Sequence, residues 1–206
     1  MGYTLNLSDI SLMDYQGLLR QQNLLPGRRM LLEELDARFA AFADLGLTTV
    51  AQLKASLATP QKMASLVQKT GIPEEYLVIL RRELGSLTQK PVSLVEFRDC
   101  DPSRIDSLAA IGIRTSQALW ECGSDASAEL FALCDLVRIN GVGAAAARAF
   151  YEAGYVSVGA VAEANAADML ARVNAVNTEK GYYKARLGRK DMQFCIDYAK
   201  LLEKYS

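Results

Sequence analysis

The sequence predicts an all-α protein of repeated helical hairpins, arranged in two small helical domains. Helix entry and exit signals recur along the chain, apolar residues fall at three- and four-residue spacing, and one glycine-centred pattern occurs three times. Half of the 206 residues are hydrophobic, so the chain can bury a core without disulfides or a structural metal.

Prolines and glycines mark where the helices start and stop. Thr59-Pro60, Ile72-Pro73 and Asp101-Pro102 place proline in a first helical turn, where its missing N–H does no harm. The glycines that predict helix ends are Gly46, Gly71, Gly85, Gly112 and Gly154. The turn-forming segment 85–93, GSLTQKPVS, predicts a boundary between an N-terminal domain, residues 1–86, and a C-terminal domain, residues 92–206.

The internal repeat is centred on Gly46, Gly112 and Gly154. An apolar residue precedes each glycine by four positions, and another follows it by seven. The residue at the third position after the glycine is Thr49, Thr115 or Ser157. Glycine tolerates the left-handed backbone that ends many helices, and Thr or Ser accepts a bond from the free N–H groups of a new helix. We therefore expect three turns that each join two helices.

Residues 141–146, GVGAAA, match the G-x-G-x-x-[GA] pattern of a dinucleotide-binding loop. That loop needs a strand before it, a helix after it and a second strand that ends in an acidic residue. Glu163 stands at a suitable distance, but the segment before it belongs to the repeat, and the 52 residues after Gly154 are too few for a doubly wound sheet. We expect residues 136–150 to form two helices joined by a turn, with no strand on either side.

The same segment resembles a helix-hairpin-helix motif, in which an h-x-G-h-G turn joins two short helices. Residues 105–150 resemble the paired domain of recombinase N-terminal regions and DNA repair proteins, which implies that backbone N–H groups of the second helix grip a phosphate. The candidate contact residues are Asn140, Gly141, Val142, Gly143 and Arg148. Asn140 replaces a common proline and Ala144–Ala146 replace common basic residues, so a hairpin that only packs against protein is the alternative.

Nearly the whole chain also resembles a bacterial family of uncharacterised cytoplasmic proteins built from such hairpins. The stretches that carry this resemblance are LLPGRRMLLEELDARFAAFADLG, LVRINGVG and NTEKGYYKARLGRKDMQFCIDYAKLL. The resemblance implies a fold of tandem helix-hairpin-helix units and carries no assigned activity.

Charge is distributed unevenly along the predicted C-terminal domain. Residues 96–135 contain three basic and eight acidic side chains, whereas residues 138–190 contain eight basic and four acidic ones. The basic part peaks in KGYYKARLGRK, where cations can hold phosphates and a tyrosine can stack on a base. The candidate residues there are Lys180, Tyr182, Tyr183, Lys184, Arg186, Arg189 and Lys190. The alternatives are a solvated loop, or a contact with the acidic segment of another subunit in a homo-oligomer.

Composition argues against several classes of function. The chain has no histidine and its four cysteines lie far apart, so we expect no metal site, no catalytic triad and no cofactor, with buried thiols in a reducing cytoplasm. No run approaches 18 apolar residues, and we expect no membrane contact. A net charge of −1 restricts any nucleic-acid contact to a local surface. These features favour a non-enzymatic cytoplasmic protein that contacts nucleic-acid backbone, with a protein-interaction scaffold as the alternative.

Overall fold

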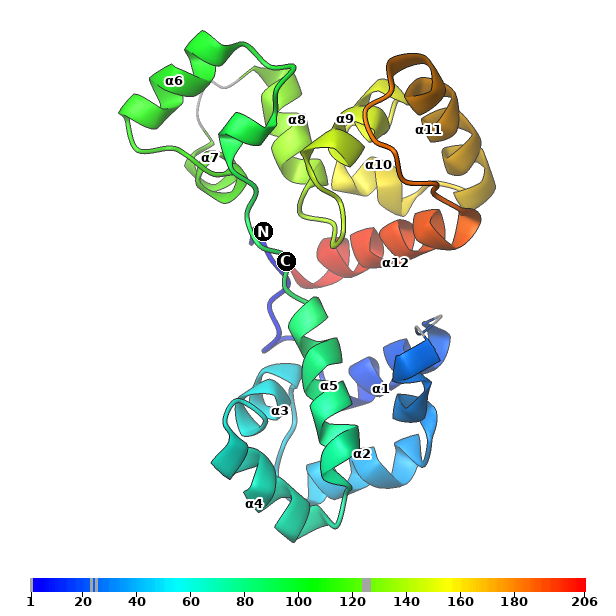
Figure 1. The fold of residues 1–206 in the computed structure, drawn as a ribbon. Helices are drawn as coiled ribbons and strands as arrows, with labels where there is room; N and C mark the ends of the chain where they lie inside the picture. The colour runs from blue at the N-terminus through cyan, green and yellow to red at the C-terminus, as the bar shows by residue number, and fades with distance from the viewer. Residues whose placement is uncertain (1, 23, 25, 124–126) are drawn as a thin grey trace. The chain divides into compact units, whose positions relative to one another are not determined.

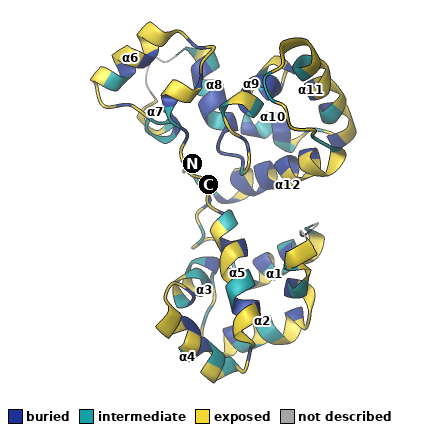
Figure 2. Cartoon of the chain, in the orientation of Figure 1, coloured by how far each residue is buried: buried dark blue, intermediate teal, exposed yellow. Residues whose placement is uncertain are grey.

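The computed structural model describes residues 2–22, 24, 26–123 and 127–206, and every regular element in this part of the chain is helical (Figure 1). Only two isolated β-bridges occur among these residues, Ser11 with Thr49 and Ser93 with Thr115. The predicted all-α class is therefore confirmed. Within each unit defined below, Figure 2 shows buried and exposed residues alternating along the helices, as amphipathic segments require.

The chain divides into two compact units. The N-terminal unit comprises Asn6–Thr88 together with Tyr205, and the C-terminal unit comprises Gln89–Lys204 together with Ser206 and the segment that ends at Leu5. The chain passes from the N-terminal unit to the C-terminal unit between Thr88 and Gln89, inside the predicted linker 85–93. Residues 2–5, which the sequence predicts for the first domain, lie with the C-terminal unit, where the Tyr3 hydroxyl and Ser116 Oγ share a buried hydrogen bond of 2.6 Å.

The N-terminal unit packs its helices around a core of leucines and aromatic residues. Its helices are α1 (Leu12–Gln21), the 3-10 helix η1 (Pro26–Leu32), α2 (Leu35–Asp44), α3 (Val50–Ser56), α4 (Pro60–Thr70) and α5 (Glu74–Ser86). Phe42, Tyr76 and Leu80 are fully buried in this core. Thr59 caps α4 and Pro60 occupies its first turn, as the sequence predicts.

The C-terminal unit contains the remaining helices. They are the 3-10 helix η2 (Leu94–Glu96), α6 (Pro102–Ala110), α7 (Ser116–Cys122), α8 (Ala128–Leu136), α9 (Ala144–Glu152), α10 (Val158–Ala162), α11 (Ala166–Lys180) and α12 (Arg189–Tyr205). Along α12 the buried residues recur at helical spacing, from Met192 through Ile196 and Ala199 to Leu202. One face of this long helix thus contributes to the core of the unit.

The three repeat glycines share one local geometry. Gly46, Gly112 and Gly154 have φ of +79°, +90° and +93°, and each follows the end of a helix. The side chains of Thr49, Thr115 and Ser157 then accept backbone hydrogen bonds at the starts of α3, α7 and α10. The apolar residues at the fourth position before and the seventh after are all buried: Phe42, Leu53, Leu108, Leu119, Phe150 and Val161. The predicted left-handed glycines and the predicted caps are confirmed.

Two predictions from the sequence are wrong. Gly85 is not the left-handed residue that follows a helix, because α5 includes it and ends one residue later, at Ser86, before the buried Leu87. The thiol of Cys122 is exposed, because this residue ends α7 directly before Gly123, while the other three thiols are buried and all four are free.

Arg138 is the most heavily bonded buried charge of the C-terminal unit, with 3% of its surface exposed. Its guanidinium donates to the carbonyl oxygens of Tyr3 at 2.9 Å and Gly2 at 3.1 Å, and to Ser206 Oγ at 2.9 Å. It also pairs with Asp135. The centroid of the Trp120 ring lies 4.5 Å from the guanidinium carbon of Arg138, so a cation–π contact covers one face of the cation.

We predict that Gly154→Val lowers the free energy of unfolding by about 1 kcal/mol or more, because a branched residue is forced into left-handed backbone. The added Cβ itself would meet only the Arg172 side chain at 3.5 Å, an ordinary contact, so the loss comes from the backbone. Urea denaturation of the variant and of the wild type measures this loss in the free energy of unfolding. Gly159→Ala in α10 is the control, since Gly159 lacks a positive φ. Equal midpoints for the two variants would refute the assigned turn geometry.

We predict that Arg138→Met destabilises the C-terminal unit by about 3 kcal/mol, because Asp135 and two carbonyl groups lose their buried donor. The fluorescence of Trp120, the only tryptophan of the sequence, follows unfolding of this unit in urea. Arg172→Met is the matched control, since Arg172 is exposed and its guanidinium lies over the Tyr155 ring at 5.5 Å. A loss of similar size in both variants would contradict the role of Arg138.

Candidate nucleic-acid interface

The turn between α8 and α9 contains the glycine-rich segment. α8 ends at Leu136, successive tight turns follow, Gly141 has φ of +85°, and α9 begins at Ala144. Leu136, Ile139 and Val142 are buried, so the apolar side of the turn closes on the core as predicted. The described residues on both sides of the turn form helices and no strand, which removes the structural context of a dinucleotide-binding loop.

The outer side of this turn is open. Gly141 and Gly143 are exposed, and a Cβ added at either would meet no atom within 4 Å. Gly143 is the N-cap of α9 and supplies no side-chain cap, so the N–H groups of the first helical turn lack that partner. Asn140 is half-buried, and the Val142 carbonyl accepts a hydrogen bond from Gln89 Nε2 at 3.4 Å. An anion can therefore approach the backbone here without displacing a side-chain cap.

The segment 181–188 joins α11 to α12 as an extended loop (Figure 1). Gly181 ends α11 in left-handed backbone with φ of +69°. The Asn177 side chain holds the loop at Tyr183, because its Oδ1 accepts from the Tyr183 N–H at 3.0 Å and its Nδ2 donates to the Tyr183 carbonyl at 3.0 Å. The loop backbone is thus fixed to α11.

The two tyrosines of the loop are half-buried. The Tyr182 hydroxyl donates to Glu152 at the end of α9, and loss of solvation together with this bond raises the pKa of Tyr182 to about 12. Burial raises the pKa of Tyr183 as well, and its hydroxyl has no hydrogen-bond partner among the described residues. The Tyr182 side chain therefore ties the loop to the end of α9, whereas Tyr183 is held through its backbone.

The charged side chains of the loop differ in whether they are paired. Lys180 forms an ion pair with Glu179 at 3.0 Å, which raises the pKa of the ammonium group. Four exposed cations have no hydrogen-bond or ion-pair partner in the described part of the chain: Lys184, Arg186, Arg189 and Lys190. We call these four residues the basic loop surface.

The basic loop surface includes the first turn of a helix. Arg189 and Lys190 are the first two residues of α12, where the helix dipole disfavours cations by about 0.3–1 kcal/mol each. Asp191 offsets part of this repulsion, since its Oδ2 accepts from the Gly188 N–H at 2.7 Å. An anion bound there would offset the remaining repulsion between the two cations and the helix dipole.

Arg148 is buried and paired with acidic side chains, so it is not free to contact a phosphate. It is 6% exposed, and its guanidinium pairs with Glu129 and lies 3.8 Å from Asp99 Oδ2. Arg138 is also buried, so two of the eight basic residues in 138–190 are paired inside the C-terminal unit and do not face a ligand. We therefore leave Arg148 out of the proposed contact surface.

The α8–α9 turn and the basic loop surface lie toward opposite ends of α12. Arg138, three residues before Gly141, bonds to Ser206 beyond the C-terminal end of α12, whereas Arg189 and Lys190 begin that helix (Figure 1). α12 has 17 residues, and at about 1.5 Å per residue it spans roughly 25 Å. The predicted residues therefore form two separate surfaces of one unit.

Both surfaces lie in a region that matches a protein family. A family model described as a domain of unknown function (DUF4332) matches residues 100–202. The chain belongs to this family. The DUF4332 region extends from just before α6 into the last turn of α12, so it contains two of the three repeat glycines and every candidate contact residue. Searches of curated proteins and of solved structures found no match.

Two further findings concern the described residues alone. None of their helices is both long and apolar enough to cross a membrane. None of their His, Cys, Asp and Glu side chains gather in threes as a metal site would need.

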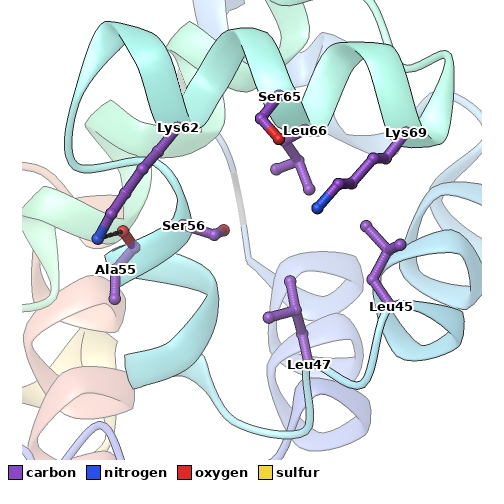
Figure 3. Close-up of a pocket in the computed structure, with 8 residues that line it drawn as sticks. All are labelled: Leu45, Leu47, Ala55, Ser56, Lys62, Ser65, Leu66 and Lys69. Carbon is purple, nitrogen blue, oxygen red and sulfur yellow. Dashed lines mark hydrogen bonds between the residues drawn. The ribbon is translucent and has the colours of Figure 1, made fainter.

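The sequence reasoning missed a groove in the N-terminal unit, lined by the α2–α3 turn and by α4 (Figure 3). On α4, Lys62, Leu66 and Lys69 stand at positions i, i+4 and i+7, which places them on one helix face. That spacing alone resembles any amphipathic helix, because the other two leucines of the groove come from the α2–α3 turn.

We predict that Asn177→Ala releases the 181–188 loop from α11. Hydrogen exchange at the Tyr183 amide should then become at least about fivefold faster, since a hydrogen bond contributes about 1 kcal/mol. Asn174→Ala is the matched control on the same helix, because Asn174 is exposed and has no hydrogen bond to the loop. Unchanged exchange in Asn177→Ala would show that other contacts hold the loop.

Proposed function

We propose that this protein is a non-enzymatic binding protein of the cytoplasm whose C-terminal unit contacts the phosphate backbone of nucleic acid. The basic loop surface carries this proposal. Its four exposed cations have no partner among the described residues; two stand on a loop whose backbone is hydrogen-bonded to α11, and two begin α12 directly after that loop. Cations that lack internal partners are free to replace the counterions of a polyanion, and this replacement drives association.

The fixed backbone of the loop favours binding over a merely solvated surface. A mobile basic loop loses conformational freedom when it binds, and that loss opposes association. Here Asn177 and the Tyr182–Glu152 bond already restrict the loop. The two cations at the start of α12 are also placed against the helix dipole, so a phosphate relieves a repulsion that exists in the free protein.

The α8–α9 turn supplies a second contact under this proposal. We assign it to the helix-hairpin-helix type, because its apolar side is buried and its two glycines are exposed. The N–H groups at the start of α9 would then meet a phosphate through the backbone alone. The length of α12, roughly 25 Å, corresponds to about seven base pairs at 3.4 Å each, so we expect both contacts to fall within one turn of a single duplex.

A protein-interaction scaffold is the second candidate, and a different surface favours it. Val95 and Ile111 are 69% and 71% exposed, and both lie at or beside the acidic segment 96–135. Exposed apolar side chains surrounded by charge are typical of protein contacts. The same acidic segment could meet the basic loop surface of another copy, giving a homo-oligomer.

We predict salt-sensitive binding to duplex DNA of any sequence. If three or four phosphates are neutralised, the logarithm of the binding constant should fall against the logarithm of the salt concentration with a slope of about −3 to −4. Replacing Lys184, Arg186 and Arg189 together with alanine should weaken binding for all sequences alike and flatten the slope, because phosphate contacts carry no base readout. Fluorescence anisotropy at several salt concentrations measures both quantities.

The matched control replaces Lys54, Arg81 and Arg82, three basic residues of the N-terminal unit, with alanine and removes the same net charge. Gly143→Val tests the turn independently, since a branched side chain obstructs the backbone at the start of α9. No salt-sensitive binding by the wild-type protein, or equal binding by the loop triple variant and the wild type, overturns the proposal. If Gly143→Val binds DNA as the wild type does, the α8–α9 turn is not part of the contact and the basic loop surface alone remains in the proposal.

A further inference from the structure

The groove in the N-terminal unit has a cavity volume of about 360 Å³. Leu45 and Leu47 stand on either side of Gly46 in the α2–α3 turn, and Leu66 faces them from α4 (Figure 3). Leu45 is 41% exposed although it is apolar. Three leucines thus form an apolar floor at the surface of the unit.

Two lysines of α4 border this floor, and they differ in their bonding. Lys62 Nζ donates to the Ala55 carbonyl at the end of α3, at 3.2 Å. The Lys69 ammonium points into the groove between Leu66 and the leucines of the turn, and it has no hydrogen-bond or ion-pair partner among the residues that the structure describes (Figure 3). Of the residues described as lining the groove, none is acidic. The groove therefore lacks an anion for Lys69.

We propose that this groove receives an acidic amphipathic helix of a partner protein, with an apolar side chain on the three leucines and a carboxylate against Lys69. Side chains three or four positions apart on a helix have Cβ atoms about 5–6 Å apart, which suits an apolar and an acidic residue binding side by side. Apolar centres with charged rims are the common pattern of helix-in-groove recognition.

The open shape of the groove favours a helix over a small anionic amphiphile. Pockets for small ligands enclose about 70–90% of the ligand surface. This groove is open to solvent rather than enclosed, so it covers one side of what it holds. A helix buries its remaining surface in its own protein, whereas a free amphiphile would leave its apolar chain in water. The inference is independent of nucleic-acid binding, which we assign to the other unit.

The test is selection of displayed helical 12-residue peptides on the immobilised full-length protein. Enriched peptides should carry Leu, Ile or Phe with Asp or Glu three or four positions away. An enriched peptide, synthesised with a fluorophore, should bind Lys69→Glu roughly tenfold more weakly, because an attractive charge pair becomes repulsive. Leu45→Gln should also weaken binding of this peptide, because it removes one of the three leucines. The matched control Arg82→Glu, on α5 and outside the groove, should bind as wild type does.

Thermal melting of each variant separates lost binding from lost folding, and DNA binding by Lys69→Glu should equal that of the wild type. The proposal is overturned if no peptide is enriched above the empty support, or if Lys69→Glu and Leu45→Gln, both folded, bind the peptide normally. It is also overturned if decanoate shifts the NMR signals of Leu47 and Leu66 while the peptides do not. Self-association that Lys69→Glu abolishes would assign the groove to a second copy instead.

Discussion

Burying a guanidinium without satisfying its donors would cost several kcal/mol, and the C-terminal unit is arranged so that Arg138 avoids this cost. Its partners come from the segment before Leu5, from α8 and from Ser206, while the Trp120 ring of α7 covers one face of the planar cation. Asp135 extends the network, because its second carboxylate oxygen accepts from the Val158 N–H at 2.7 Å. The start of α10 and the α8–α9 turn are therefore positioned by one ion pair, Arg138 with Asp135.

Much of the fold could be predicted because its signals are local. A left-handed glycine followed at the third position by Thr or Ser needs no knowledge of the rest of the chain, and Gly46 with Thr49 behaves as this rule requires. Gly85 shows where the rule stops, since α5 includes this glycine and ends one residue later, between the buried Leu84 and Leu87. Tertiary packing overrode a local preference there.

The candidate site was harder to predict, since pairing between distant residues decides which charges are free. A count along 138–190 treats Arg148 and Arg186 alike, yet Arg148 is neutralised by Glu129 from another helix and Arg186 has no such partner. Lys69 was overlooked for the reverse reason. Along the sequence it resembles any solvated lysine of an amphipathic helix, and only the fold places the leucines of the α2–α3 turn beside it. Position in space, which the sequence encodes only through the whole fold, separates these cases.

The three glycine-centred turns also bear on how the chain acquires its fold. Each is closed by a backbone hydrogen bond from the residue after the glycine to the carbonyl five positions earlier, as from Leu47 to Phe42 and from Tyr155 to Phe150, and closing so short a loop loses little entropy. The Arg138–Tyr3 bond, by contrast, joins residues 135 positions apart. Because local contacts form early and distant ones late, we expect the hairpins to be nuclei and the network around Arg138 to be the closing step of folding.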